Sequence, residues 1–163
     1  MSEVIRFVLS QMPALLFIAA LVLAFVLKRP ADFAGRLLDW LLLLPVGLES
    51  LWAGLFHIFL PNVAAQSIGW TASPFQFEIG VADAAIGVVA IVSFWRSLNF
   101  KAAVIGYIVL FNIGVAIGHV HQAMSAGNFS ANNFGLLLAL TIVDAVLLPI
   151  LYVIVRRRQT RTA

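Results

Sequence analysis

An uncharged apolar stretch of 21 residues, 7–27, most constrains what this chain can fold into. As an α-helix that rises about 1.5 Å per residue, it would be ~30 Å long, which is the thickness of a bilayer's hydrocarbon core. Further apolar segments follow at about 37–60, 74–95, 102–120 and 134–155. We therefore predict an all-α, polytopic membrane protein, in which residues 1–163 form a single domain with a bundle of five transmembrane helices.

The composition excludes a water-soluble globule and narrows the expected partners. Hydrophobic residues make up 63% of the chain and charged residues 10%, whereas an average soluble domain has about 25% charged residues. The lipid bilayer is therefore the expected partner. The net charge of +3 does not indicate nucleic acid, because four of the ten basic residues lie in the last eight positions, as in a membrane-flanking tail. Without cysteine, the chain has no thiolate ligand for a metal.

The distribution of basic residues predicts the orientation in the membrane. Five spans place the termini on opposite sides, and nine of the ten Lys and Arg residues then share the face that carries the C-terminus. By the positive-inside rule this face is cytoplasmic and the N-terminus lies outside, as expected in the inner membrane of a bacterium. Asp32 and Asp39 lie at the same face, where we expect solvated ion pairs near Arg36.

Several residues predict where helices begin, bend or pack. Pro45 leaves a backbone carbonyl without its helical partner and interrupts the second span. The run 73–76 (Ser, Pro, Phe, Gln) has the spacing of a capping box, and the asparagine pair 132–133 is expected to cap the fifth span. Gly114 and Gly118 have the small-xxx-small spacing that lets helices approach closely in lipid.

The two outer loops, 61–72 and 121–133, are long and uncharged apart from a histidine. Trp70 in the first of them is an expected interfacial anchor, and residues 64–68 are expected to form a short helix. We therefore predict an outer-face re-entrant or interfacial loop, with both loops covering the bundle.

Ionisable side chains inside the predicted spans are the main functional signal. Such groups are costly at membrane depth, usually face the bundle interior, and indicate a functional site. The predicted spans contain no Lys or Arg that would neutralise their carboxylates. These carboxylates must therefore be protonated, paired with histidine, reached by water, or bound to a cation.

Depth along the helices separates the polar residues into two layers. The upper layer lies within ~8 Å of the outer helix ends by helical rise and consists of His57, Glu78 and His119. The lower layer lies ~14 to 18 Å from the same ends and consists of Glu49, Asp83, Asn112 and Asp144.

Angular position, at ~100° per residue, tests which of these side chains can share an interior. Asn112 and His119 differ by only ~20° and share a face. Glu78 and Asp83 differ by ~140°, so both cannot point at one centre on a straight helix. His119 and His121 differ by ~200° and face apart unless the helix ends between them.

The upper layer has the composition of a metal site. His57, Glu78 and His119, with His121 as a fourth ligand, offer imidazole and carboxylate ligands that suit a divalent zinc, iron or copper ion. Two histidines on different helices are also the axial ligands of some haems, but no sequence feature favours haem over a bare ion. The lower layer of Glu49, Asp83, Asn112 and Asp144 would extend a proton or cation path.

The order of these residues resembles a known sequence pattern. His57 is followed by Ile-Gly-Trp at 68–70, Ser-Pro-Phe-Gln at 73–76, Glu78, and Asp-Ala-Ala-Ile-Gly at 83–87. This order is similar to that of a family of small uncharacterised bacterial multi-pass membrane proteins. The resemblance implies a shared fold and names no reaction.

A more distant resemblance concerns the segment from Glu78 to Trp95, its basic turn and the next helix, which are similar in pattern to DoxX-like proteins. Some DoxX-like proteins are associated with quinone-linked sulfur oxidation, so this resemblance implies a link to redox chemistry. The predicted five spans depart from the DoxX-like plan.

Three functional hypotheses follow from the sequence. The first is an integral membrane protein with an outward-facing His/carboxylate cavity that binds a divalent metal or a proton, with a redox link. The second is a proton-coupled small-solute transporter subunit, which at this length would act as a homo-oligomer. The third is a passive accessory subunit whose polar residues join helices within a membrane complex.

Overall fold

The computed structural model of the protein describes residues 11–28 and 31–162, and within them the chain forms helices and loops with no strand. The helices follow in the order α2 (Met12–Val26), α3 (Phe33–Leu41), the π-helix η1 (Leu42–Leu48), α4 (Glu49–Phe59), α5 (Pro61–Ser67), α6 (Phe75–Ser93), α7 (Leu98–Ala126) and α8 (Leu136–Thr162). The predicted all-α class is confirmed.

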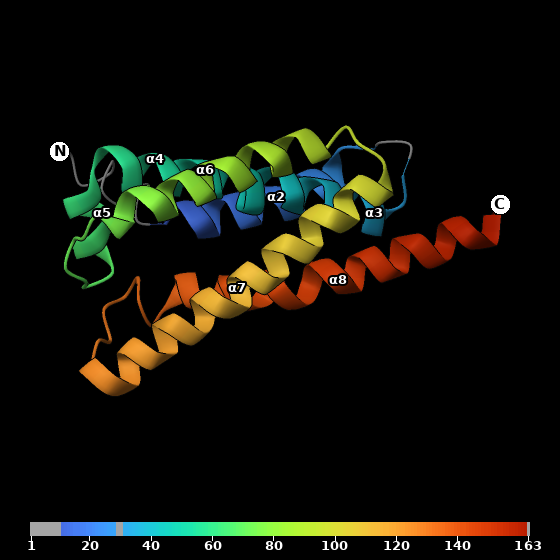
Figure 1. Cartoon of the computed structure of the whole chain (residues 1–163). Coiled ribbons are helices and arrows are strands. Elements are labelled where there is room, and N and C mark those ends of the chain that lie inside the picture. The colour runs from blue at the N-terminus through green and yellow to red at the C-terminus, as the bar shows by residue number, and fades with distance from the viewer. Residues whose placement is uncertain (1–10, 29–30, 163) are drawn as a thin grey trace.

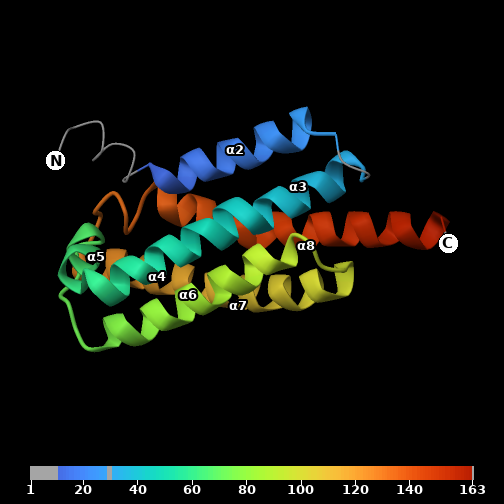
Figure 2. The ribbon, with the colours of Figure 1, turned by 90° about the horizontal axis from the view of Figure 1, so that it is seen from above.

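Figures 1 and 2 show how these helices are arranged. α3, η1 and α4 form one continuous rod that lies between α2 and α6 (Figure 2). α7 starts at the turn after α6, diverges from α6 along its length, and packs along α8 (Figure 1). α5 and the loop before α8 lie at one end of the bundle, whereas the start of α3, the α6–α7 turn and the end of α8 lie at the other.

Four helical stretches are long and apolar enough to cross a membrane: Phe33–Phe59, Phe75–Ser93, Leu98–Ala126 and Leu136–Arg161. Large apolar side chains such as Leu110 and Ile117 are exposed on them, as expected for helices that face lipid. The structure therefore supports a multi-pass membrane protein. The predicted first span is represented by α2, which has 15 residues and is about 22 Å long, while residues 7–10 lie outside the described part of the chain.

Capping residues move several helix ends away from their predicted positions. The second span starts before residue 37, because the Asp32 carboxylate accepts a hydrogen bond from the Gly35 N–H at 2.8 Å and caps α3. α7 exceeds the predicted range 102–120 at both ends, because Ser97 caps its start and Gly127, with a φ of 63°, ends it. α8 continues beyond residue 155 through the arginine-rich tail.

Two predicted helix caps are wrong, because the side chains concerned make tertiary contacts. No side chain caps the start of α6, so Ser73 and Gln76 do not form a capping box. The Gln76 side chain bonds to His57 instead. Asn133 lies before α8 and is fully buried, where it accepts a hydrogen bond from Trp70.

Glycine allows α4 and α6 to pack closely. A Cβ on Gly54 would lie 2.5 Å from the Ala84 nitrogen and 2.6 Å from the Gly80 carbonyl oxygen. Gly114 and Gly118 behave differently, since no described atom lies within 4 Å of a Cβ added at either position. Within the described chain no helix approaches Gly114 or Gly118 closely, and the close approach occurs between α4 and α6 instead.

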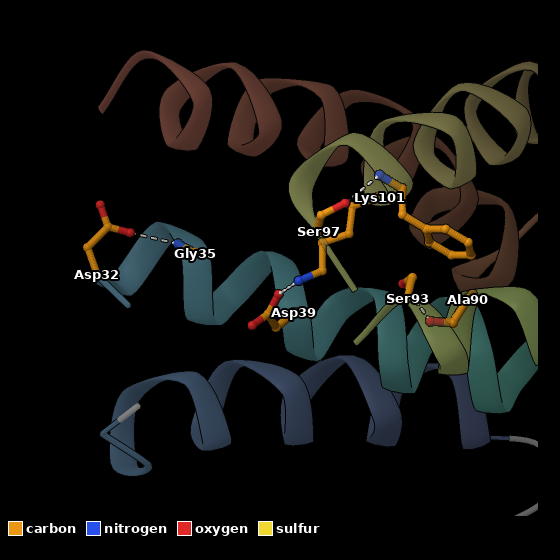
Figure 3. Close-up of polar contacts among 8 residues, drawn as sticks. Asp32, Gly35, Asp39, Ala90, Ser93, Ser97 and Lys101 are labelled. Atoms are coloured by element: carbon orange, nitrogen blue, oxygen red, sulfur yellow. Dashed lines mark hydrogen bonds and ion pairs between the residues drawn. The ribbon is translucent and has the colours of Figure 1, made fainter. Parts of the chain in front are cut away.

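A buried ion pair links α3 to α7 at the end of the bundle away from α5 (Figure 3). The Lys101 ammonium lies 2.5 Å from the Asp39 carboxylate, and the two side chains are 10% and 15% exposed. The predicted solvated pair of Asp39 is therefore wrong, because α7 starts before Lys101 and carries a basic residue onto α3. Asp32 forms a more exposed pair with Arg158, and Arg36 donates to backbone carbonyls.

The Asp32 cap leads to a stability prediction. The backbone N–H of Gly35, with help from Arg158, holds the pKa of Asp32 below its ordinary value of 3.8. Asp32→Ala is expected to lower the free energy of unfolding by about 1 kcal/mol, measured by denaturant unfolding in micelles at neutral pH. Because the folded state has the lower pKa, this difference is present above pH 3.8 and is lost as the pH falls below that value. Asp32→Ser keeps a capping oxygen and is the control; an equal loss in both variants would contradict the capping role.

Candidate functional site

A cavity of about 620 Å³ lies between α4 and α6 on one side and α7 and α8 on the other. Its walls also include residues of η1 and of the loop that follows α5. Six of the predicted site residues line this cavity: Glu49, His57, Asp83, Asn112, His119 and Asp144. The fold thus brings polar side chains from helices far apart in the sequence to one space.

Three carboxylates form one part of the cavity lining. Glu49 directly follows the π-helix that contains Pro45, a wider turn that accommodates the missing proline N–H. Asp83 on α6 and Asp144 on α8 are 9% and 5% exposed. Glu49 lies near enough to both aspartates for their charges to interact. The three acids therefore form one electrostatic group within the bundle.

The Asp144 carboxylate has an unsatisfied oxygen. Its Oδ1 atom is buried and has no hydrogen-bond partner among the described residues. Trp40 Nε1 is likewise buried without a partner, but Trp40 does not line the cavity. None of the described residues that line the cavity is Lys or Arg. An unpaired carboxylate oxygen away from water is costly, so this arrangement suits a proton or a cation that donates a hydrogen bond.

Two histidines in another part of the lining are each bonded to a side-chain amide. His57 Nδ1 donates to Gln76 Oε1, and His119 Nδ1 donates to Asn133 Oδ1 at 2.8 Å. The Asn133 nitrogen donates to two backbone carbonyls, which fixes the amide oxygen toward His119. Because both amide oxygens are acceptors, each Nδ1 carries the proton and each Nε2 of a neutral ring is an acceptor.

The two outer loops are joined to each other over these histidines. Trp70 Nε1 donates to Asn133 Oδ1 at 3.2 Å, and the indole ring lies 5.8 Å from the imidazole ring of His119. Asn128 in the second loop donates to the Ile68 carbonyl in the first at 2.8 Å. The helix predicted at 64–68 is present as α5, which begins the first loop.

Glu78 lies away from the cavity. Gln76 and Asp83 both line the cavity and differ by only ~20° around α6, whereas Glu78 differs from Gln76 by ~200°. Glu78 is accordingly exposed. Glu78 and Asp83 were not expected to face one centre together, and it is Asp83 that faces the cavity. Gln76 lies next to His57, where Glu78 was expected.

His121 also lies away from the cavity, because α7 continues unbroken past it. Its exposed ring contacts Ser125 one turn further along the helix. Within the described part of the chain, no three His, Asp or Glu side chains converge as a metal ion would require. The structure therefore does not support the predicted metal centre of His57, Glu78, His119 and His121.

Gln76, which lines the cavity, and Asn133, which bonds to the cavity residue His119, are the functional residues that sequence reasoning missed. Each one fits a helix-capping pattern, so each was interpreted as a cap residue and not as the hydrogen-bond partner of a histidine. Their depth in the membrane could have identified them, because both lie near the outer helix ends, where the histidines were also expected. A buried imidazole N–H needs an acceptor, and an uncharged amide supplies one.

A family model matches nearly the whole chain. It describes a family of unknown function, DUF6790, and matches residues 10–161. The chain belongs to the DUF6790 family. All the cavity residues named above fall within the DUF6790 match, and the predicted membership in an uncharacterised family is confirmed. No curated protein and no solved structure matches this DUF6790 chain. The match shows neither a link to DoxX-like proteins nor a bacterial source, so both stay predictions.

Proposed function

We propose that this DUF6790 protein is a multi-pass membrane protein that holds protons, or a cation in their place, on Glu49, Asp83 and Asp144. The observation that carries the proposal is the buried Asp144 Oδ1, which has no hydrogen-bond partner among the described residues. A carboxylate in a low-dielectric cavity remains ionised only beside a positive charge. The described lining supplies no Lys or Arg, which leaves water, a proton or a bound cation to stabilise the acids, and only a proton or a cation also relieves the repulsion between them.

A polar route toward the outer loops supports the same function. The cavity lining continues from the acids to Trp70, Thr71 and Ser73 in the loop after α5. His57 and His119 also line it, and a neutral imidazole ring offers one hydrogen-bond donor and one acceptor. We propose that protons reach the acids from the outer side along this route.

The proposed topology has five spans. Residues 7–27 form the first span, and α5 lies at the outer face as an interfacial or re-entrant element. The described basic residues belong to the end of the bundle where α3 and α7 begin and α8 ends. This distribution supports a cytoplasmic location for that end and an outside N-terminus in a bacterial plasma membrane.

The size of the cavity favours a second candidate, a proton-coupled small-solute transporter subunit. The cavity volume of about 620 Å³ falls within the roughly 300 to 1,000 Å³ of small-molecule sites. A solute would then share the cavity with the protons on the acids. Because a five-span chain without an inverted repeat is small for a transporter, a homo-oligomer would be the transporting unit.

Infrared difference spectroscopy of the protein in lipid nanodiscs tests the proposed proton site. A step from alkaline to acidic pH is expected to add a carbonyl-stretch band from newly protonated buried carboxyl groups. Asp144→Asn should remove part of this band, because it removes one of the protonatable groups. Asp32→Asn is the control, since Asp32 lies outside the cavity. A folded Asp144→Asn protein with the full native band would contradict the proposal.

A further inference from the structure

Some residues of α6 and α7 that line the cavity are also strongly exposed. Phe75 and Leu110 line the cavity and are 65% and 74% exposed, which indicates an opening of the cavity beside them. Gly114 and Gly118 continue the same edge of α7, and no described atom lies within 4 Å of a Cβ added at either glycine. Figure 1 shows that α7 diverges from α6 beyond the turn that joins them. We call the edge formed by these four residues the side portal.

The side portal lies where the hydrocarbon core of a membrane would be. Leu110 and Gly114 are near the middle of α7, which is 29 residues long. Ile113 and Ile117, next to this edge on the outer surface, are exposed apolar side chains. A molecule dissolved in the bilayer can therefore reach the cavity without passing the joined outer loops.

The cavity interior combines apolar walls with an acidic region. Ile79, Ile108 and Phe111 are among the apolar lining residues. In the acidic region, Asp144 Oδ1 has no hydrogen-bond partner among the described residues, and the negative charges of Asp144 and Asp83 act on Glu49. A ligand that matches both features has one positively charged hydrogen-bond donor and an apolar remainder.

We infer that the cavity binds an amphipathic organic amine, whose ammonium group donates to Asp144 while its apolar body enters through the side portal and lies against the cavity walls. This inference rests on the proposed function, because the ammonium occupies the place of a proton or cation on the acids. A charge-assisted hydrogen bond would join the ammonium to the Asp144 carboxylate, and its single positive charge would compensate one of the three acids while the other two hold protons.

Inorganic cations match the cavity less well than an amine does. A hydrated ion gains nothing from apolar walls, whereas an alkyl chain is stabilised by burial against them. A divalent metal requires several converging ligands, and the described residues contain no such group of three. The inference therefore commits to the organic amine, and an inorganic cation is an outcome that the test can reveal.

Photolabelling of the full-length protein in nanodiscs tests this inference. The probe is an octylamine analogue with a diazirine near the end of its alkyl chain, and plain octylamine is the competitor. We expect octylamine, but not octanol or sodium chloride, to displace the label from peptides of α6 and α7. Asp144→Asn and Asp83→Asn should each weaken displaceable labelling by about tenfold or more, because contacts between charged groups are lost. Asp32→Asn should label like the native protein.

The possible results separate the amine inference from the proposed proton site. Equal displacement by octylamine and octanol, displacement by sodium chloride alone, or native labelling in both cavity variants would each overturn the amine inference. If labelling fails but the infrared band still decreases in Asp144→Asn, the proton site stands and only the amine is rejected. If that band is also unchanged, the proposed function fails as well.

Gly114→Phe tests the side portal separately from the acids. A phenyl group at this edge is expected to slow labelling from the bilayer several-fold relative to the native protein. Gly106→Phe is the matched control, because Gly106 also has open space around it but does not line the cavity. Equal labelling rates in the two variants would overturn entry through the side portal.

Discussion

Replacing Gly54 with valine is expected to lower the free energy of unfolding by about 3 kcal/mol, at the upper end of the usual range for overpacked sites. Even the first added carbon would lie 2.5 Å from the Ala84 nitrogen and 2.6 Å from the Gly80 oxygen. Both are backbone atoms of α6, so the contact is relieved only by moving α4 and α6 apart. The same movement would lengthen the bond between His57 on α4 and Gln76 on α6.

Denaturant unfolding in micelles, followed by circular dichroism, measures this effect. Gly106→Val is the control, because no described atom lies within 4 Å of a Cβ at Gly106 and only helix propensity changes there. We expect Gly106→Val to be neutral or slightly stabilising. A Gly54→Val protein as stable as the control would show that α4 and α6 do not depend on this close approach.

Changing Asp39 to leucine is expected to lower the free energy of unfolding by about 3 to 5 kcal/mol. The Lys101 side chain is 10% exposed and its ammonium lies 2.5 Å from the Asp39 carboxylate. Removing that carboxylate leaves a buried positive charge without the partner that compensates it. Adding Lys101→Leu in the same chain should recover most of the loss, because two apolar side chains then pack where two charges were desolvated.

A double-mutant cycle of Asp39→Leu and Lys101→Leu, measured by unfolding in micelles, tests this coupling. The interaction energy of residues in direct contact is expected to be well above the experimental error of additivity, which is about 0.5 kcal/mol. Asp32→Leu combined with Arg158→Leu is the matched control at a more exposed ion pair, where the coupling should be small. Additive effects at Asp39 and Lys101 would contradict a buried pair.

The positions of the spans follow from local sequence, and most were predictable for that reason. Apolar runs of sufficient length identified the four long helices, and Pro45 identified the irregular segment that the structure shows as a π-helix. The helix ends were less predictable. Asp32 and Ser97 each extend a helix with a single hydrogen bond, and hydropathy carries no information about such bonds.

The cavity was predictable in part. Helical rise and angle correctly indicated that Asn112 and His119 could share a face, and that Glu78 and Asp83 could not both face one centre. Neither argument could tell which acid turns inward, because that depends on the rotation of α6 against α4. The close contact at Gly54 and Gly80 sets this rotation, and it brings Gln76 and Asp83 to the cavity.

The amino-acid sequence by itself determined that this chain forms apolar helices and that these helices carry acids and histidines with few positive charges between them. Those properties depend on neighbours along the chain, whose order is fixed. Only the tertiary structure decided that Glu49, Asp83 and Asp144 line one cavity, that Gln76 and Asn133 hold the histidines, and that Glu78 and His121 face away. Helix rotation and the divergence of α7 from α6 set these outcomes, and both arise from packing between residues distant in the sequence.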